Sequence, residues 1–170
     1  MKYRALITGA TGFVGGYVAE CLHAEGWHVS AVVRSTSQRD VLPPTVRDDM
    51  QFYDADQMPL SEIVRTAAPD VVFHLATYYT TEHSPAEIDA LISANITFGT
   101  KLLDAMAQHG VQNFVYARSS WQYYRGDAYE PVNLYAASKE AFDAMVRFYE
   151  SAHDLHSIRL TLFDTYGEHD

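Results

Sequence analysis

The sequence predicts an α/β fold in which helices cover both faces of a doubly wound parallel sheet. Apolar runs of strand length alternate along the chain with segments of helical period. The runs are continuous rather than alternating with polar residues, which is typical of parallel strands buried on both faces. A turn with three closely spaced glycines follows the first run, as in the first strand–helix turn of such sheets. We expect right-handed crossovers between the strands.

The order of the elements follows from these patterns. Strands are expected at residues 3–8, 27–33, 50–53, 71–76, 114–117 and 158–163. Helices are expected at residues 13–25, 60–68, 85–109 and 133–153. Gly26 and Gly110 stand where a helix ends, and Pro69 ends the short second helix. Residues 34–47, which include Pro43-Pro44, are the one long stretch expected to be irregular.

Length and composition fit one globular domain. The chain has 170 residues, of which 48% are hydrophobic and 20% charged, which excludes disordered and fibrous classes. Its formal net charge of −10 argues against binding to nucleic acid or to an anionic membrane. The first apolar run stops at Thr8-Gly9, too soon for a signal peptide or a membrane span. We therefore expect a cytoplasmic protein with neither a membrane nor a nucleic-acid partner.

No pattern in the sequence indicates a metal site. The single cysteine, Cys21, excludes an intrachain disulfide and a cysteine metal cluster. We expect it on the buried stripe of the first helix, beside Val14, Val18 and Leu22. None of the eight histidines is paired at metal-ligand spacing with a carboxylate on a shared face.

The glycine turn predicts a dinucleotide-binding site. Gly9 permits a tight turn with positive φ, Gly12 lets the backbone approach a pyrophosphate, and Gly15 lets the helix pack close to the sheet. The N–H groups at the start of the helix then face the phosphates. A glycine-rich turn without a ligand is the alternative.

The end of the second strand favours NADP(H) over NAD(H). An acidic residue there would bind the ribose 2′-hydroxyl of NAD. Residues 32–37 instead read Val-Val-Arg-Ser-Thr-Ser, with no carboxylate until Asp40. Arg34 and these hydroxyls suit a 2′-phosphate, although a solvated arginine is also common after a strand.

Tyr135 and Lys139 stand four residues apart at the start of the last helix, which places both on one face. A nearby ammonium and the positively charged nicotinamide ring favour the phenolate and lower the tyrosine pKa, so the phenol can act as a proton donor to a carbonyl oxygen. Ser119 and Ser120 follow the fifth strand at the carboxyl edge, where open α/β sheets place their sites. One of these hydroxyls is expected to bind the reacting oxygen, and strand register favours Ser119.

Together these motifs resemble the extended short-chain dehydrogenase/reductases, the NAD-dependent epimerase/dehydratase family, whose members act mostly on nucleotide-activated sugars. The resemblance runs from residue 3 to residue 167 and rests on the glycine turn, the serine pair and the following residues: His74-Leu75-Ala76, Asn95, Tyr135 and Lys139. It implies a Rossmann fold and an NAD(P)-dependent enzyme.

The resemblance also implies roles for single residues. Ser119, Tyr135 and Lys139 stand at the family's catalytic positions. Asp54-Ala55 is similar to its adenine contact, and residues 163–167 are similar to the segment that passes the nicotinamide. With the turn and Arg34, this predicts cofactor contacts from the following residues: Gly9, Thr11, Gly12, Phe13, Val14, Gly15, Arg34, Asp54, Ala55, Leu75, Ala76, Thr77, Asn95, Tyr135, Lys139 and Phe163.

A narrower resemblance concerns the substrate. Residues 119–124, 131–135 and 161–167 are similar to the CDP-paratose and CDP-abequose synthases, as are Glu82-His83 and residues 95–100. Those enzymes are NADPH-dependent 4-ketoreductases, so the resemblance implies reduction of a 4-keto group on a CDP-linked deoxysugar. Dehydratases of the family carry an Asp-Glu pair after the catalytic threonine, whereas Ser120-Trp121 stands here and disfavours dehydration.

The length of the chain leaves two other functions open. Family members continue well past Gly167 with a part that binds the nucleotide-sugar, whereas this sequence stops at Asp170. Residues 1–170 are therefore expected to be the NAD(P)-binding domain of a longer protein, without the substrate-binding part. A C4 epimerase that keeps NAD bound, and a truncated dinucleotide-binding module without turnover, remain the alternatives.

A homodimer is also expected. Helices 85–109 and 133–153 match the pair that extended members of the family use as a four-helix interface. Apolar residues lie on more than one stripe of the first helix: Ile88, Leu91, Ile92, Phe98, Leu102 and Leu103. Several loop tyrosines are expected at the carboxyl edge, to stack on a sugar or base or to fill space there: Tyr78, Tyr79, Tyr123, Tyr124 and Tyr129.

Overall fold

A six-stranded sheet in the order β3-β2-β1-β4-β5-β6 organises the chain, and each adjacent pair of strands is parallel. The structure is a computed structural model and describes residues 2–126 and 130–168. The strands are β1 (Arg4–Thr8), β2 (His28–Val33), β3 (Gln51–Asp54), β4 (Val71–His74), β5 (Asn113–Ser119) and β6 (His156–Leu162). The doubly wound α/β fold is confirmed.

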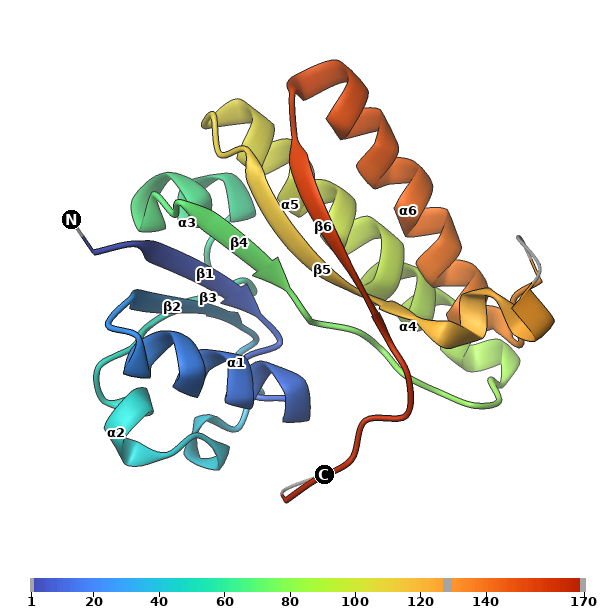
Figure 1. The fold of residues 1–170 in the computed structure, drawn as a ribbon, viewed down its shortest axis with the longest axis horizontal. Coiled ribbons are helices and arrows are strands. Elements are labelled where there is room, and N and C mark those ends of the chain that lie inside the picture. Colours follow the sequence, from blue (N-terminus) through green and yellow to red (C-terminus); the bar gives the residue numbers. More distant parts are fainter. Residues whose placement is uncertain (1, 127–129, 169–170) are drawn as a thin grey trace.

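Helices lie on both faces of the sheet (Figure 1). The longer ones are α1 (Phe13–Ala24), α3 (Leu60–Ala67), α5 (Phe98–Gln108) and α6 (Leu134–His153). α3, α5 and α6 cover one face, whereas α1 and the single turn α2 (Pro44–Arg47) lie on the other. Asn133 begins α6, because its side-chain Oδ1 accepts from the Ala136 N–H at 2.9 Å.

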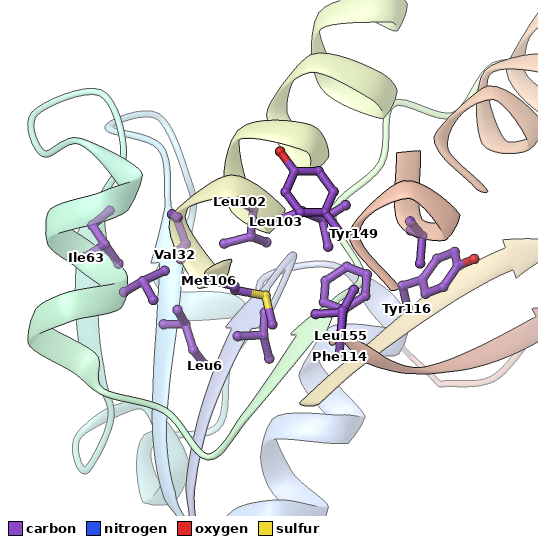
Figure 2. Packing of buried hydrophobic residues seen from close by; sticks show 14 of the residues in the cluster. Leu6, Val32, Ile63, Leu102, Leu103, Met106, Phe114, Tyr116, Tyr149 and Leu155 are labelled. Carbon is purple, nitrogen blue, oxygen red and sulfur yellow. The ribbon is translucent and has the colours of Figure 1, made fainter. Parts of the chain in front are cut away.

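Two hydrophobic clusters fill the space between these layers. Consecutive residues of β1 divide between them: Leu6 belongs to the cluster under α3, α5 and α6, and Ile7 to the cluster under α1. Figure 2 shows Leu6 in the first cluster with Met106 and Phe114. The central strands are therefore buried on both faces, as their continuous apolar runs predict.

The segment predicted as one helix at residues 85–109 is helical from Pro85 to Gln108, but its helical period is not uniform. This segment divides into a 3₁₀ turn η2 (Pro85–Glu87), α4 (Ile88–Ile92), a π-helical turn η3 (Ser93–Thr97) and α5. A capping box between Ser84 and Glu87 starts it. The π turn carries the buried Asn95, whose polar side chain is satisfied by a neighbouring loop rather than by solvent. Apolar spacing alone does not reveal such a local change of helical period.

The stretch at residues 34–47 is less irregular than its prolines indicate. It contains a 3₁₀ turn, η1 (Arg39–Val41), and α2, in which Pro44 occupies the first turn. Proline is favoured at that place because its missing N–H has no partner in a first turn. Leu42 and Val46 are buried against α1 and the sheet.

One region departs from the expectation of burial on both faces. Cys21 is exposed, so its predicted place on a buried stripe is wrong; the buried residues of α1 are Gly15 and Ala19. On β6, Ile158 and Leu160 are 60% and 41% exposed. Side chains alternate along a strand, so these two lie on the sheet face opposite Arg159, which pairs with Glu150 of α6. The helix α1 on that face packs over β1 and β2 instead. Within residues 2–126 and 130–168, no helix has both the length and the apolar character needed to cross a membrane.

Candidate cofactor and reaction site

A cleft of about 1100 Å³ lies at the carboxyl edge of the sheet. The sheet order reverses between β1 and β4, and ligands of open α/β sheets bind at such a switch point. The glycine turn, the end of β2, the loop after β4, the end of β5, the start of α6 and the segment after β6 all line the cleft. The structure thus gathers most of the sequence-predicted site residues around one space.

The glycine turn is a tight cradle at one end of this cleft. Gly9 has φ of 78°, and a Cβ there would lie 2.5 Å from the Ala76 backbone nitrogen. A Cβ on Gly15 would lie 2.0 Å from the Gly9 carbonyl oxygen. Gly12 is the N-cap of α1 and provides no side-chain cap, which leaves N–H groups of the first turn for a ligand. Thr11, Phe13 and Val14 also line the cleft.

The end of β2 presents Arg34 and Ser37 to the cleft. Ser37 Oγ accepts from the Arg34 backbone N–H at 3.0 Å, which turns the chain back at this point. Arg34 is exposed, and its guanidinium lies on the surface rather than in a buried ion pair. This arrangement leaves Arg34 able to meet a phosphate, as the sequence predicts.

Asp54 and Ser35 bind each other instead of facing the cleft. Ser35 Oγ donates to Asp54 Oδ2 at 2.7 Å, and the Asp56 backbone N–H donates to Asp54 Oδ1 at 2.9 Å. These hydrogen bonds, the one from Ser35 being the stronger, hold the pKa of the Asp54 carboxyl below its usual value. Ala55 and Asp56 line the cleft at this point. Of the two residues predicted to contact the adenine, Ala55 thus lines the cleft and Asp54 does not. The Ser35 hydroxyl donates its hydrogen to Asp54.

Asn95 lies behind the cleft rather than in it. Its Oδ1 accepts from Thr77 Oγ1 at 3.0 Å and from the Tyr78 N–H at 2.7 Å. Its Nδ2 donates to the Tyr78 carbonyl and to Ser138 Oγ, both at 3.0 Å. Both donors and both acceptor lone pairs are therefore occupied. Asn95 fixes the loop after β4 against α6, while Leu75, Ala76 and Thr77 of that loop line the cleft.

The opposite end of the cleft brings together the three predicted catalytic residues. Tyr135 and Lys139 are only 8% and 6% exposed, and the Lys139 Nζ lies 6.0 Å from the centre of the Tyr135 ring. Lys139 Nζ donates to the Ala117 carbonyl oxygen at 3.2 Å. The polar side chains of Thr77 and Ser119 line the cleft beside Tyr135. Ser119 and Ser120 both line the cleft, so the preference for Ser119 continues to rest on strand register.

The electrostatics at this end differ from the expectation. Burial raises the pKa of Tyr135, and the neighbouring polar side chains of Thr77 and Ser119 only partly offset this rise. The lowering predicted from the neighbouring ammonium does not prevail, because burial penalises the phenolate more strongly. Burial also lowers the pKa of Lys139 to about 8, against the attraction of Asp143. In the absence of a cofactor the phenol therefore carries its proton at neutral pH.

Aromatic rings form one wall beside Tyr135. The Tyr79 ring centre lies 5.1 Å from that of Tyr135, edge to face, and 5.8 Å from that of Trp121. Tyr78, also expected at this edge, donates its hydroxyl to Glu87 at 2.7 Å. Tyr123 lies under the Arg118 guanidinium. Tyr124 is exposed, and Tyr129 lies outside the described residues.

The segment after β6 closes the cleft on the side opposite α6. Phe163, Asp164 and Thr165 line it, although Phe163 is largely exposed. The same segment borders a hollow of about 640 Å³ beside the exposed stripe of α1. Phe163, the residue predicted to contact the nicotinamide, thus borders the cleft with little packing around its ring.

Sequence reasoning missed a buried polar cluster behind Ser119. It comprises Tyr116 and Arg118 of β5, Gln122 of the 3₁₀ turn η4 (Ser120–Gln122), and Glu140 and Asp143 of α6. The available signals were an arginine next to Ser119 and a carboxylate one turn after Lys139. Elsewhere in the part of the chain that the structure describes, no three histidine, cysteine or acidic side chains gather as metal ligands would.

Comparison with known proteins gives one family. The model of the NAD dependent epimerase/dehydratase family matches residues 5–170. UDP-glucose 4-epimerase of Corynebacterium glutamicum is 26% identical over 174 residues, covering 96% of this chain and 52% of that protein. CDP-abequose synthase of Salmonella muenchen is 28% identical over 168 residues, covering 98% of this chain and 55% of that protein. The chain thus spans about half the length of the curated relatives it matches.

Solved structures agree on the fold. The UDP-glucose 4-epimerase of Thermus thermophilus, in complex with NAD, has a TM-score of 0.80 and 26% identity, covering 97% of this chain and 58% of that one. The UDP-glucose 4-epimerase of Brucella ovis, in complex with NAD, has a TM-score of 0.84 and 24% identity, covering 95% of this chain and 52% of that one.

Proposed function

Since the chain belongs to the NAD dependent epimerase/dehydratase family, we propose that it reduces the 4-keto group of a nucleotide-activated deoxysugar with NADP(H), as part of a longer protein. A CDP-linked sugar is the favoured substrate, in keeping with the similarity to CDP-abequose synthase. The observation that carries the proposal is the meeting of Tyr135, Ser119 and Lys139 at the carboxyl edge, with the phenol in its protonated form.

The cleft fits a dinucleotide on physical grounds. Side chains at Gly9 and Gly15 would collide with backbone, so the turn keeps its N–H groups close to whatever lies above it. The first turn of α1 has no side-chain cap and presents positive partial charge, which favours a pyrophosphate. When bound, NADP(H) supplies the hydride.

Tyr135, Ser119 and Lys139 have separate roles in the reduction of the ketone. Tyr135 donates its proton to the ketone oxygen as negative charge develops on that oxygen. Ser119 Oγ accepts from the Trp121 N–H at 3.2 Å, which leaves the hydroxyl hydrogen free to donate to the same oxygen. The Lys139 ammonium holds the ribose of the nicotinamide nucleotide and stabilises the phenolate that proton transfer leaves behind.

The wall formed by Tyr79 and Trp121 favours a deoxygenated sugar. Aromatic rings pack well against C–H groups and poorly against hydroxyls that need hydrogen-bond partners. Trp121 and Ser120 stand where dehydration would require an acid and a base, and both line the cleft. Ketone reduction therefore suits these residues better than elimination of water.

Arg34 supports the preference for NADP(H). It stands where an acidic residue would select NAD, and it faces the cleft. A C4 epimerase using tightly held NAD remains the second candidate, because UDP-glucose 4-epimerases are among the relatives. A dinucleotide-binding module without turnover is the third. Net consumption of NADPH separates the reductase from both.

We further propose that the longer protein supplies the sugar-binding part. Ile158 and Leu160 of β6, and the hollow beside α1, are apolar surfaces that additional structure would cover. The 170-residue chain is then expected to bind the cofactor with little turnover, because few residues would orient the sugar.

The homodimer is likewise proposed rather than observed. Leu91, Leu102 and Leu103 are fully buried within the subunit, so the wide apolar arc of residues 85–109 is used mostly internally. Ile88 on α4 and Phe148 on α6 remain 38% and 57% exposed and are available to a second copy. Sedimentation at micromolar concentration is expected to show a dimer, and monomer alone would contradict it.

The function is tested by mixing the longer protein with NADPH and a CDP-4-keto-3,6-dideoxyhexose. We expect stoichiometric loss of NADPH absorbance and formation of the 4-hydroxy sugar. Interconversion of C4 epimers without net loss of NADPH would establish the epimerase instead. Robust turnover by the 170-residue chain alone would contradict the division between cofactor and sugar-binding parts.

A further inference from the structure

A buried carboxylate lies one helical turn behind Lys139. Asp143 is fully buried on α6 and shares the helix face of Lys139. The Tyr116 hydroxyl donates to its Oδ1, and Arg118 Nη2 lies 2.6 Å from its Oδ2. Two side chains of β5 thus hold the carboxylate that stands behind the reaction end of the cleft.

Gln122 connects this cluster to Ser119. It is fully buried, and its Nε2 donates to Glu140 Oε2 at 2.9 Å and to Asp143 Oδ2 at 3.5 Å. Its Oε1 accepts from the Ser119 backbone N–H at 2.9 Å. The backbone of Ser119 is therefore tied, through one side chain, to the helix that carries Lys139.

Filling this space with charged and polar side chains costs more free energy than filling it with apolar ones. Burying an ion pair costs desolvation energy that its attraction seldom exceeds, and apolar residues of similar volume often stabilise as well or better. Arg118 is not fully satisfied either, since its Nε has no hydrogen-bond partner among the residues described. A cluster of this kind beside reacting groups points to a need for fixed geometry and charge rather than for stability.

We propose that Asp143 and Gln122 are positioning residues of the reaction site. Asp143, neutralised in part by Arg118, keeps Lys139 in its ammonium form, and Gln122 fixes Ser119 at the distance from Tyr135 that reaction requires. Neither residue is among those that line the cleft, so both act through the residues they hold. The inference rests on the proposed function, and its tests are made on the cofactor-free chain.

The charged groups around Lys139 determine how the removal of Asp143 changes the Lys139 pKa. Burial lowers the pKa of Lys139 to about 8, and the Asp143 carboxylate raises it. Tyr135 on α6 is neutral, and His74 on β4 is also neutral because burial lowers its pKa to about 3. On β5, Arg118 is paired with Asp143. Among these groups Asp143 is the one that favours the ammonium.

The first test titrates Lys139 in the 170-residue chain by NMR of ¹³C-labelled lysine. Asp143→Asn is expected to lower the Lys139 pKa below its value of about 8, because the buried carboxylate that raises this pKa is removed. Asp104→Asn on α5 is the matched control. Its carboxylate accepts from Gln108 and Tyr149, and we expect the Lys139 titration to stay unchanged.

A second variant covers the case in which Asp143→Asn leaves Arg118 unpaired and unfolds the chain. Arg118→Met with Asp143→Asn removes both charges and is expected to fold, with the Lys139 pKa still lowered. An unchanged Lys139 titration in either folded variant would overturn the role of Asp143. Unfolding of both variants would assign the pair to stability alone and would overturn it as well.

Gln122→Leu tests the link to Ser119. The charged pair remains, so the Lys139 titration should stay close to that of the unchanged chain, whereas the midpoint of unfolding should fall because Glu140 and the Ser119 N–H lose a buried partner. Hydrogen exchange of the Ser119 amide should become at least tenfold faster, because its acceptor is lost. Unchanged protection of that amide would overturn the role of Gln122. Failure of the chain to bind any dinucleotide would refute the proposed function, whereas these titrations would still decide the inference.

Discussion

At the glycine-turn end of the cleft, the cofactor is offered backbone N–H groups and exposed side chains such as Arg34. At the opposite end, Tyr135 and Lys139 are almost fully buried, Lys139 donates to the Ala117 carbonyl, and Asp143 lies one helical turn behind it. Burial shifts the pKa values of Tyr135 and Lys139 at this second end, whereas Arg34 is exposed to solvent. Changes at the buried end should therefore alter chemistry and stability together, whereas changes at Arg34 should alter only cofactor preference.

The largest effect is expected at the buried end. In the longer protein, Tyr135→Phe removes the proton donor and keeps the ring that packs on Tyr79. The rate of ketone reduction should fall by roughly 10²–10⁴-fold, the usual contribution of a general acid, with cofactor affinity nearly unchanged. Single-turnover oxidation of NADPH measures this. An unchanged rate would remove Tyr135 from the mechanism.

The glycine turn gives the next effect, and it acts through backbone packing. Gly15→Ala places a Cβ 2.0 Å from the Gly9 carbonyl oxygen and should lower the free energy of unfolding by about 1–3 kcal/mol. Gly16→Ala is the matched control, because its nearest neighbour would be 3.7 Å away. The control should be neutral or stabilising by up to about 1 kcal/mol, since alanine is the better helix former. Urea unfolding of both variants decides, and equal stability would contradict the close packing of the turn.

Acid should weaken the sheet beneath the buried end. The pKa of His74 falls from 6.5 to about 3 on burial, so between these values the unfolded chain binds a proton that the folded chain does not. The free energy of unfolding should then decrease by about 2 kcal/mol between pH 7 and pH 5. The lowered pKa of Glu87 contributes only below its unfolded value of 4.5. A flat stability over this range would show that His74 is not sealed from water.

The smallest effect is expected at the exposed end. Arg34→Ala should weaken the binding of NADP(H) by about tenfold, because a single exposed arginine–phosphate pair is screened by solvent. Its effect on NAD(H) should be negligible. Arg39→Ala is the control, since Arg39 lies over the Phe52 ring, 4.9 Å from its centre, and does not line the cleft. Equal weakening of the binding of both cofactors would show that Arg34 does not bind the 2′-phosphate.

The same contrast separates what the sequence predicts from what it does not. Local patterns located the glycine turn, the α6 face with Tyr135 and Lys139, and the end of β5 at Ser119, because each depends on short-range spacing. The contacts of Asn95 and the cluster of Asp143 with Gln122 join residues that are far apart in the chain. Such contacts leave no periodic pattern in the sequence from which they could be predicted. The raised pKa of Tyr135 follows from burial, and burial is set by the packed loop after β4. Cys21 shows the opposite kind of error: the sequence pattern predicted a buried stripe on α1, but this residue is exposed.

Titration of the 170-residue chain with NADPH and with NADH, followed by nicotinamide fluorescence, tests the central claim most directly. We expect saturable binding of both reduced cofactors at one site, with NADPH bound more tightly. Tighter binding of NADH would contradict the assignment of Arg34 and favour the epimerase. Absence of binding by either cofactor would contradict the cleft itself as a dinucleotide site.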